Sequence, residues 1–242
     1  MAVTEVLANA KMLGVEYMLC VSVDMDSYTD VLSLAEQYDC IYASVGVHPN
    51  TKMQKELSLK TLVQLASNEH VIAIGETGLD YFRSKGEIEW QRERFRTHIR
   101  ASKSVYKPLI IHTRDAGEDI IRILQEEGAD EVGGVMHCFV EDWETAQKAM
   151  EMNFYISFSG IVTFKNAIEV QEVAKQVPLE RMLVETDSPY LTPVPYRGKP
   201  NQPGYTRYVA EYIAKLHGTS LEHVAEQTTA NFFKLFNIKN HS

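Results

Sequence analysis

Cysteine is scarce in this sequence, and the few cysteines present are poorly spaced for a joint role. There are three, at Cys20, Cys40 and Cys138. An odd number of widely separated cysteines argues against a disulfide framework and against a zinc site built from cysteine pairs. Cys20 and Cys40 lie inside apolar segments, so we interpret both as small buried hydrophobic residues.

Long apolar runs are also missing. No uninterrupted apolar stretch approaches the roughly 20 residues that a membrane helix needs. The first residues lack the basic and apolar regions of a secretory signal, and positions 1–13 instead show an amphipathic helical pattern. The sequence therefore predicts a cytoplasmic protein with no membrane partner, and no obligate protein partner is evident.

Excess positive charge is absent. The 242 residues include 33 acidic and 24 basic side chains, which gives a formal net charge of −9. A protein that holds a long duplex by neutralising its phosphates is normally basic. If nucleic acid is the substrate, local groups or bound cations must hold it, because the overall field repels it.

Along the chain, short apolar runs alternate with longer helical patterns. The apolar runs are Tyr17–Val23, Ile41–Val47, Val71–Gly75, Leu109–His112, Gly134–Cys138, Tyr155–Ser159 and Met182–Thr186. Strand and helix in repetition imply parallel strands with crossover helices. The length suits one large domain. We therefore predict an α/β fold, a TIM-type (β/α) barrel forming a single domain over residues 1–242, with further helices at the C-terminal end.

The number of strands is one short of a closed barrel, which has eight. Because a helical pattern precedes the first apolar run, we expect the first strand of the barrel to be the absent one. Seven strand–helix units can also form an open doubly wound sheet, which is the alternative fold.

Polar residues able to bind metal recur where the apolar runs end. They are His48, Glu76, His112, His137 and Asp187. In a barrel, the C-terminal ends of the strands converge on one mouth, where active sites are built. Each residue alone has a structural explanation, such as a turn for Asp187 or a core position for His137. Together, imidazoles and carboxylates on separate strands, with no thiolate motif, predict an open catalytic site for zinc, manganese, magnesium or iron.

Five segments in order resemble the TatD family of metal-dependent hydrolases. They are GVHP (46–49), GETGLDY (75–81), IHTRDA (111–116), HCF (137–139) and ETDSPYL (185–191). The resemblance runs from about Val6 to Ile238. It implies an amidohydrolase-like barrel and deoxyribonuclease activity, with DNA or oligonucleotide ends as the substrate.

The resemblance also implies a cofactor and roles for the polar residues. Two divalent metal ions are expected, of Mg, Mn or Zn. Glu76 would bridge the two ions, and His112 and His137 would bind one of them. Asp187 would bind metal and accept a proton from the attacking water. His48 would lie near the metals and the substrate phosphate.

One departure from the family pattern concerns the start of the chain. Members of the family normally begin with a strand that ends in a His-x-His pair, which supplies two ligands to one metal. Here the first histidine is His48, so we expect the missing strand and the missing pair to be one gap. Either the gene product starts upstream, or this chain lacks half of one metal site.

The favoured prediction is a TatD-like deoxyribonuclease that cleaves phosphodiester bonds. Arg114 is predicted to contact the substrate, because basic groups near the site would offset the acidic surface. Two alternatives remain. The same metal constellation serves amide and lactone hydrolysis in related barrels, and a form without the His-x-His pair would bind metal poorly and have little activity.

Overall fold

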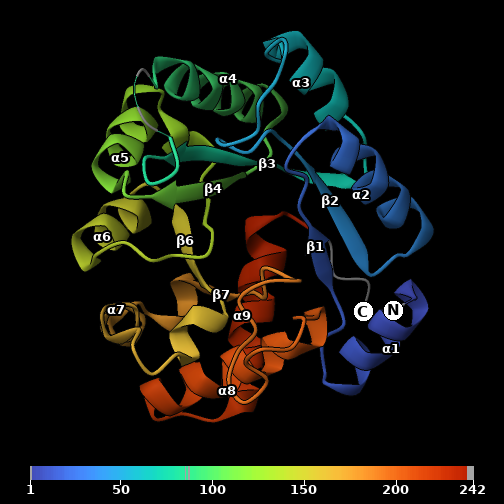
Figure 1. Cartoon of the computed structure of the whole chain (residues 1–242), viewed down its shortest axis with the longest axis vertical. Helices are drawn as coiled ribbons and strands as arrows, with labels where there is room; N and C mark the ends of the chain where they lie inside the picture. The colour runs from blue at the N-terminus through green and yellow to red at the C-terminus, as the bar shows by residue number, and fades with distance from the viewer. Residues whose placement is uncertain (1, 85, 87, 239–242) are drawn as a thin grey trace. The chain divides into compact units, whose positions relative to one another are not determined.

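A computed structural model describes residues 2–84, 86 and 88–238. Strands and helices alternate along the chain, as the apolar runs predicted (Figure 1). The helices and strands are, in chain order, α1 (Val3–Met12), β1 (Met18–Cys20), α2 (Met25–Gln37), β2 (Ile41–Val45), α3 (Leu59–Ala66), β3 (Val71–Asp80), α4 (Glu89–Val105), β4 (Leu109–Arg114), α5 (Gly117–Glu126), β5 (Gly134–Met136), α6 (Trp143–Glu151), β6 (Phe154–Phe158), α7 (Ile168–Gln176), β7 (Met182–Val184), α8 (Thr206–His217) and α9 (Leu221–Leu235). Short 3-10 helices are η1 (Ala129–Glu131), η2 (Gly160–Thr163), η3 (Leu179–Arg181) and η4 (Pro203–Tyr205).

The chain divides into two compact units, which we describe separately. Unit 1 comprises residues 1–18, 138–146 and 155–242, and unit 2 comprises residues 19–137 and 147–154. The single domain predicted for residues 1–242 stays a prediction. Among the described residues, none of the helices combines the length and the apolar character that crossing a bilayer requires.

The sheet of unit 2 follows the order of the sequence. Its strands are neighbours in the order β1 to β5, and β2 to β5 pair in parallel. Helix α4 packs against β3 and helix α5 against β4 (Figure 1). In a doubly wound sheet the strand order reverses at a switch point. The uninterrupted order in this unit contains no such point, as expected for a barrel-type fold.

Strand β3 is longer than the apolar run that predicted it. Its first residues, such as Val71 and Ile74, are fully buried, as expected for a strand covered on both faces. The strand then continues to Asp80, because its second half pairs with β4, with Gly78 opposite His112. Gly78 has a φ of +137°, and a Cβ there would lie 2.0 Å from the His112 carbonyl oxygen. Only glycine therefore allows the two strands to pair at this position.

Unit 1 contains the last two strands and the C-terminal helices. Strands β6 and β7 pair in parallel, with Ile156 opposite Met182. Helix α9 packs against β7. The buried side-chain amide of Asn231 on α9 donates hydrogen bonds to the carbonyls of Leu179 and Met182, at 2.7 and 2.8 Å. These bonds satisfy backbone acceptors next to β7 and tie the predicted C-terminal helices to the strand.

Candidate metal centre

Three imidazoles surround the buried carboxylate of Glu76 in unit 2. Glu76 Oε1 lies 3.0 Å from His112 Nδ1, 3.5 Å from His48 Nε2 and 3.8 Å from His137 Nε2. Glu76 is on β3 and His112 on β4, while His137 directly follows β5 and His48 comes three residues after β2. Because these parallel strands are neighbours, residues spread over 90 positions of the chain meet at one point.

The backbone at Glu76 is held by a network of buried serines. The N–H of Glu76 donates to the carbonyl of Ser22, 2.9 Å away. The hydroxyl of Ser44 donates to the carbonyl of Gly75 at 2.6 Å, and the hydroxyl of Ser22 donates to that of Gly46 at 3.3 Å. Since the polar backbone groups around the carboxylate have partners, the position of Glu76 is determined by the sheet beneath it.

The hydrogen-bond partners of the histidines indicate which ring nitrogens carry protons. His48 Nδ1 accepts a hydrogen bond from the N–H of Asn50 at 3.1 Å, so the neutral ring carries its proton on Nε2. His112 Nε2 lies 3.3 Å from Asp80 Oδ2 and donates to it. The lone pair of His112 Nδ1 therefore faces Glu76, while His48 Nε2 is a donor placed 3.3 Å from the same nitrogen.

Burial and mutual charge shift the pKa values of these groups. Burial alone would raise the pKa of Glu76, but His137, His112 and His48 lower it to about 2. Burial lowers the pKa of His48 to about 4. Burial also acts to lower the pKa of His112, but hydrogen bonds to Asp80 and Glu76 outweigh it and raise that pKa. Glu76 is thus an anion at neutral pH, and His112 binds a proton more readily than an isolated histidine.

The donor set fits a divalent cation. Glu76 Oε1 and His112 Nδ1 lie 3.0 Å apart, so a proton or a cation held between them is stabilised by the carboxylate charge and the ring lone pair. One ligand atom each from His48, Glu76 and His112 lies within 4.8 Å of the others. Because His48 has its proton on Nε2, Glu76 and His112 are the better cation ligands of this group.

Asp80 is a site residue to which the sequence analysis assigned no role. Its side chain is 1% exposed. Burial would raise its pKa, but hydrogen bonds from His112, the N–H of Arg83 and Asn50 lower it, so Asp80 is also an anion. A carboxylate that accepts from the distal nitrogen of a metal-binding histidine fixes the orientation of the ring. The sequence signal that could have identified Asp80 is its position four residues after Glu76, which places both side chains on the same face of β3.

Helix α4 supports the segment that carries His48. Buried Arg94 donates from Nη1 to the carbonyls of His48 and Thr51, both at 2.9 Å, and pairs with Glu56. The helical pattern of this segment predicted the helix, but nothing in the sequence indicated that Arg94 reaches the loop after β2.

The two remaining predicted site residues lie at strand ends. Arg114 is the last residue of β4, and its guanidinium lies over the ring of Phe82, 3.8 Å from the centroid. Asp187 belongs to unit 1, three residues after β7, and has a φ of +60°. Its roles as a metal ligand and proton acceptor stay predictions.

Comparisons with known proteins identify the family of the chain. Residues 2–237 match the family model of the TatD related DNases. An uncharacterized metal-dependent hydrolase, YabD of Bacillus subtilis, is 48% identical over 97% of this chain and 92% of its own length. A 3'-5' ssDNA/RNA exonuclease, TatD of Salmonella typhimurium, is 30% identical over 97% of this chain and 92% of its own length.

A solved structure extends the likeness to the fold. The crystal structure of YJJV, a TatD homologue of Escherichia coli K12, superposes with a TM-score of 0.91 at 26% identity, covering 98% of this chain and 92% of that one. The predicted TIM-type (β/α) barrel fold, with seven strands in the described residues, is thereby confirmed.

Proposed function

The chain belongs to the TatD family of metal-dependent hydrolases, and on this basis we propose that it cleaves phosphodiester bonds at the ends of single-stranded DNA or RNA. The observation that carries the proposal is the convergence of three imidazoles, those of His48, His112 and His137, on the buried carboxylate of Glu76. The name of the Salmonella relative, a 3'-5' ssDNA/RNA exonuclease, supports the choice of substrate. A cytoplasmic location, expected from the sequence, is part of the proposal.

Glu76, His112, His137 and Asp187 would hold two divalent cations, of Mg, Mn or Zn. When bound, such cations polarise a phosphoryl oxygen and lower the pKa of water. Bound cations would also offset the repulsion between nucleic acid and this acidic protein, because a local positive centre can hold the phosphates of a strand end.

The protein's own groups position the substrate and move the proton. Asp187 accepts the proton of the attacking water. His48 donates from Nε2 to a phosphate oxygen, which its hydrogen bond from Asn50 allows. Arg114 offers its guanidinium to the strand, and Asp80 keeps the ring of His112 oriented. For His48 and Asp80, the hydrogen-bonding character of the atom used follows from its partners.

The test compares substrates and metals directly. The purified protein is treated with EDTA, supplied in turn with Mg²⁺, Mn²⁺ or Zn²⁺, and incubated with a 5'-labelled single-stranded oligonucleotide of DNA or RNA. We expect shortening of the strand only with added metal, and a ladder of labelled products if cleavage starts at the 3' end. A panel of amides and lactones is assayed in parallel.

Two controls make the result decisive. Glu76→Ala should abolish metal-dependent cleavage, whereas Glu93→Gln, at an exposed glutamate of the same unit, should cleave like the wild type. Hydrolysis of the amides or lactones without cleavage of either oligonucleotide would overturn the proposal in favour of acyl chemistry. If no substrate is hydrolysed with any metal, both phosphodiester cleavage and acyl chemistry are ruled out.

A further inference from the structure

Phe82 is an exposed aromatic residue two residues after the end of β3. Its side chain is 55% exposed, and single exposed apolar residues are common on protein surfaces. Phe82 differs from them because the guanidinium of Arg114 lies 3.8 Å from its ring centroid. The N–H of Tyr81 donates to the carbonyl of Arg114 at 3.0 Å, so the backbones that carry the two side chains are joined. A cation lies over one face of the ring, and more than half of the residue's surface is exposed to solvent.

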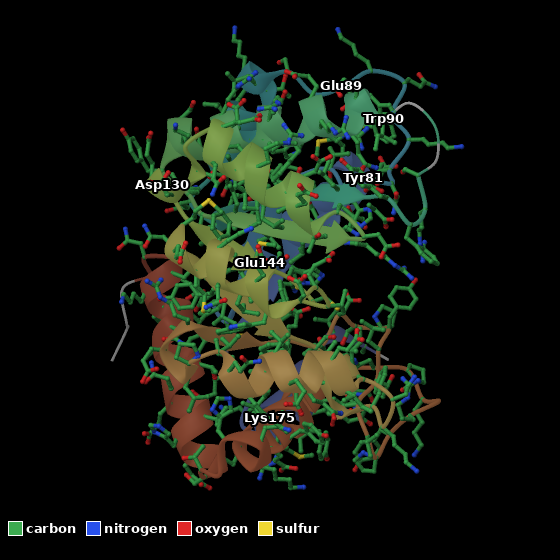
Figure 2. All side chains as sticks on the ribbon, turned by 90° about the vertical axis from the view of Figure 1, so that its left-hand side faces the viewer. Tyr81, Glu89, Trp90, Asp130, Glu144 and Lys175 are labelled. Carbon is green, nitrogen blue, oxygen red and sulfur yellow. The ribbon has the colours of Figure 1, made fainter. Side chains whose placement is uncertain are left out.

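This aromatic–arginine pair adjoins the candidate metal centre. On β4, His112 and Arg114 are two residues apart, so their side chains leave the same face of the sheet roughly 7 Å apart along the strand. Asp80 pairs in register with Arg114, and its Oδ2 lies 3.3 Å from His112 Nε2. Phe82 comes two residues after Asp80. Figure 2 shows the neighbouring Tyr81 on the same side of unit 2 as the start of α4, where Trp90 is labelled.

The charges around Phe82 favour an anionic partner. Within the described part of the chain, neither Arg83 nor Arg114 has a carboxylate oxygen within 4.0 Å. The five other arginines of unit 2 are all paired with carboxylates: Arg92, Arg94, Arg96, Arg100 and Arg122. In a chain of net charge −9, these two guanidinium groups, at the end of β4 and three residues after β3, add local positive charge that attracts phosphates.

We propose that Phe82 stacks on a nucleobase of single-stranded nucleic acid next to the bond that is cleaved, while Arg83 and Arg114 face the phosphates of the strand. The inference rests on the proposed function, because it places the substrate of that same site. Proteins that bind single strands combine aromatic stacking with basic groups, and an arginine against the opposite face of the ring adds a cation–π contact. Every base has a flat face, so this subsite favours unpaired bases with little sequence preference.

The test separates stacking from general charge attraction. Binding of a labelled single-stranded oligonucleotide is measured by fluorescence anisotropy in EDTA, where no turnover occurs. Phe82→Ala should weaken binding roughly tenfold, because stacking of one base contributes about 1–3 kcal/mol and 1.4 kcal/mol is a tenfold change. Phe82→Trp should bind at least as well as the wild type, and Phe82→Leu should resemble Phe82→Ala because it keeps the apolar character without the ring.

A series of oligonucleotides with one abasic site, moved stepwise from the 3' end, identifies the base involved. At one position the abasic site should weaken wild-type binding about as much as Phe82→Ala does, and the two changes together should cost no more than either alone. Equal weakening of intact and abasic strands by Phe82→Ala at every position would overturn the proposal, as would wild-type binding by that variant.

A matched control uses another exposed aromatic residue of unit 2. Tyr106 follows α4, just before β4 begins, and is 83% exposed; Tyr106→Ala should bind like the wild type. The binding experiment also separates the two proposals. If the wild type cleaves the oligonucleotide but no abasic position reproduces the effect of Phe82→Ala on binding, only the stacking inference fails. If the wild type cleaves no phosphodiester, the proposed function fails, and the binding series still decides whether Phe82 stacks.

Discussion

His98 Nε2 on α4 accepts a hydrogen bond from the backbone N–H of Val47, 3.1 Å away. On the other side of the ring, His98 Nδ1 donates to the carbonyl of Arg94 at 2.8 Å. The ring is 1% exposed, and burial lowers its pKa to about 4. A neutral histidine thus joins α4 to the residue before His48, and a second proton on His98 would break that link because Nε2 would no longer accept.

The first prediction concerns stability in acid. The unfolded chain binds a proton at His98 near its ordinary pKa of 6.5, and the folded chain binds it only near pH 4. The stability that neutral His98 contributes is therefore complete above about pH 6.5 and is lost as the pH falls toward 4, by up to roughly 3 kcal/mol. Urea unfolding in EDTA between pH 7.5 and 4 should show a shallower pH dependence for His98→Gln than for the wild type.

An exposed histidine provides the control for this measurement. His223→Gln should keep the wild-type pH dependence, because His223 lies on the surface of α9. If the stability of the wild type and of His98→Gln depends on pH to the same extent, His98 does not titrate between pH 7.5 and 4.

The second prediction concerns metal content. Glu76→Ala removes the carboxylate on which three imidazoles converge, so fewer divalent ions should remain per chain after purification and dialysis. Glu76→Gln should also lose metal, because the amide keeps the shape but not the negative charge. Elemental analysis gives the metal-to-protein ratio, with Glu93→Gln as the exposed control. An unchanged ratio in both Glu76 variants would remove this residue from the role of bridging ligand.

The third prediction concerns proton transfer. Asp187→Asn should lower turnover of a phosphodiester by roughly 10²- to 10⁴-fold, the usual contribution of a general base. The fold should persist, because asparagine tolerates the left-handed backbone at this position, where φ is +60°. Single-turnover kinetics measures the loss of turnover, and far-UV circular dichroism shows whether the fold persists. Wild-type rates in Asp187→Asn, or an equal loss in the exposed control Asp130→Asn, would contradict the assignment.

The fourth prediction concerns the orientation of His112. Asp80→Asn removes the charge that faces His112 Nε2, so metal affinity should fall about 10- to 100-fold. In the metal-free protein the pKa of His112 should also fall, because the hydrogen bond to Asp80 raises it. Competition with a metal indicator and an NMR titration of the His112 ring measure these changes. Asp119→Asn alters a carboxylate of the same unit that pairs with Arg92, and it should leave both quantities unchanged.

The order and approximate bounds of the strands were predictable, because a buried strand is a local run of apolar side chains. Leu109 to Ile111 is such a run, and all three residues are buried in β4. The second half of β3 was not predictable in this way. There Glu76, Thr77 and Asp80 interrupt the apolar pattern, and pairing with β4 keeps the chain extended.

The imidazole and carboxylate groups of the candidate centre were also predictable, since parallel strands of one sheet end at the same edge. His48 and His137 follow the ends of their strands, Glu76 and His112 lie further back within β3 and β4, and all four meet in unit 2. His98 and Arg94 could not be found this way, because their partners lie in a distant loop and depend on how α4 packs on the sheet.

By itself, the sequence determined the alternation of strands and helices and the chemical identity of the groups at the strand ends, because both are properties of neighbouring residues. Only the tertiary structure decided where the protons lie. The hydrogen bond from Asn50 places the proton of His48 on Nε2, and His112 Nε2 donates to Asp80, which leaves the lone pair of Nδ1 toward Glu76. A ring nitrogen becomes a donor or an acceptor through the atoms that surround it in space, and for His112 those atoms come from another strand.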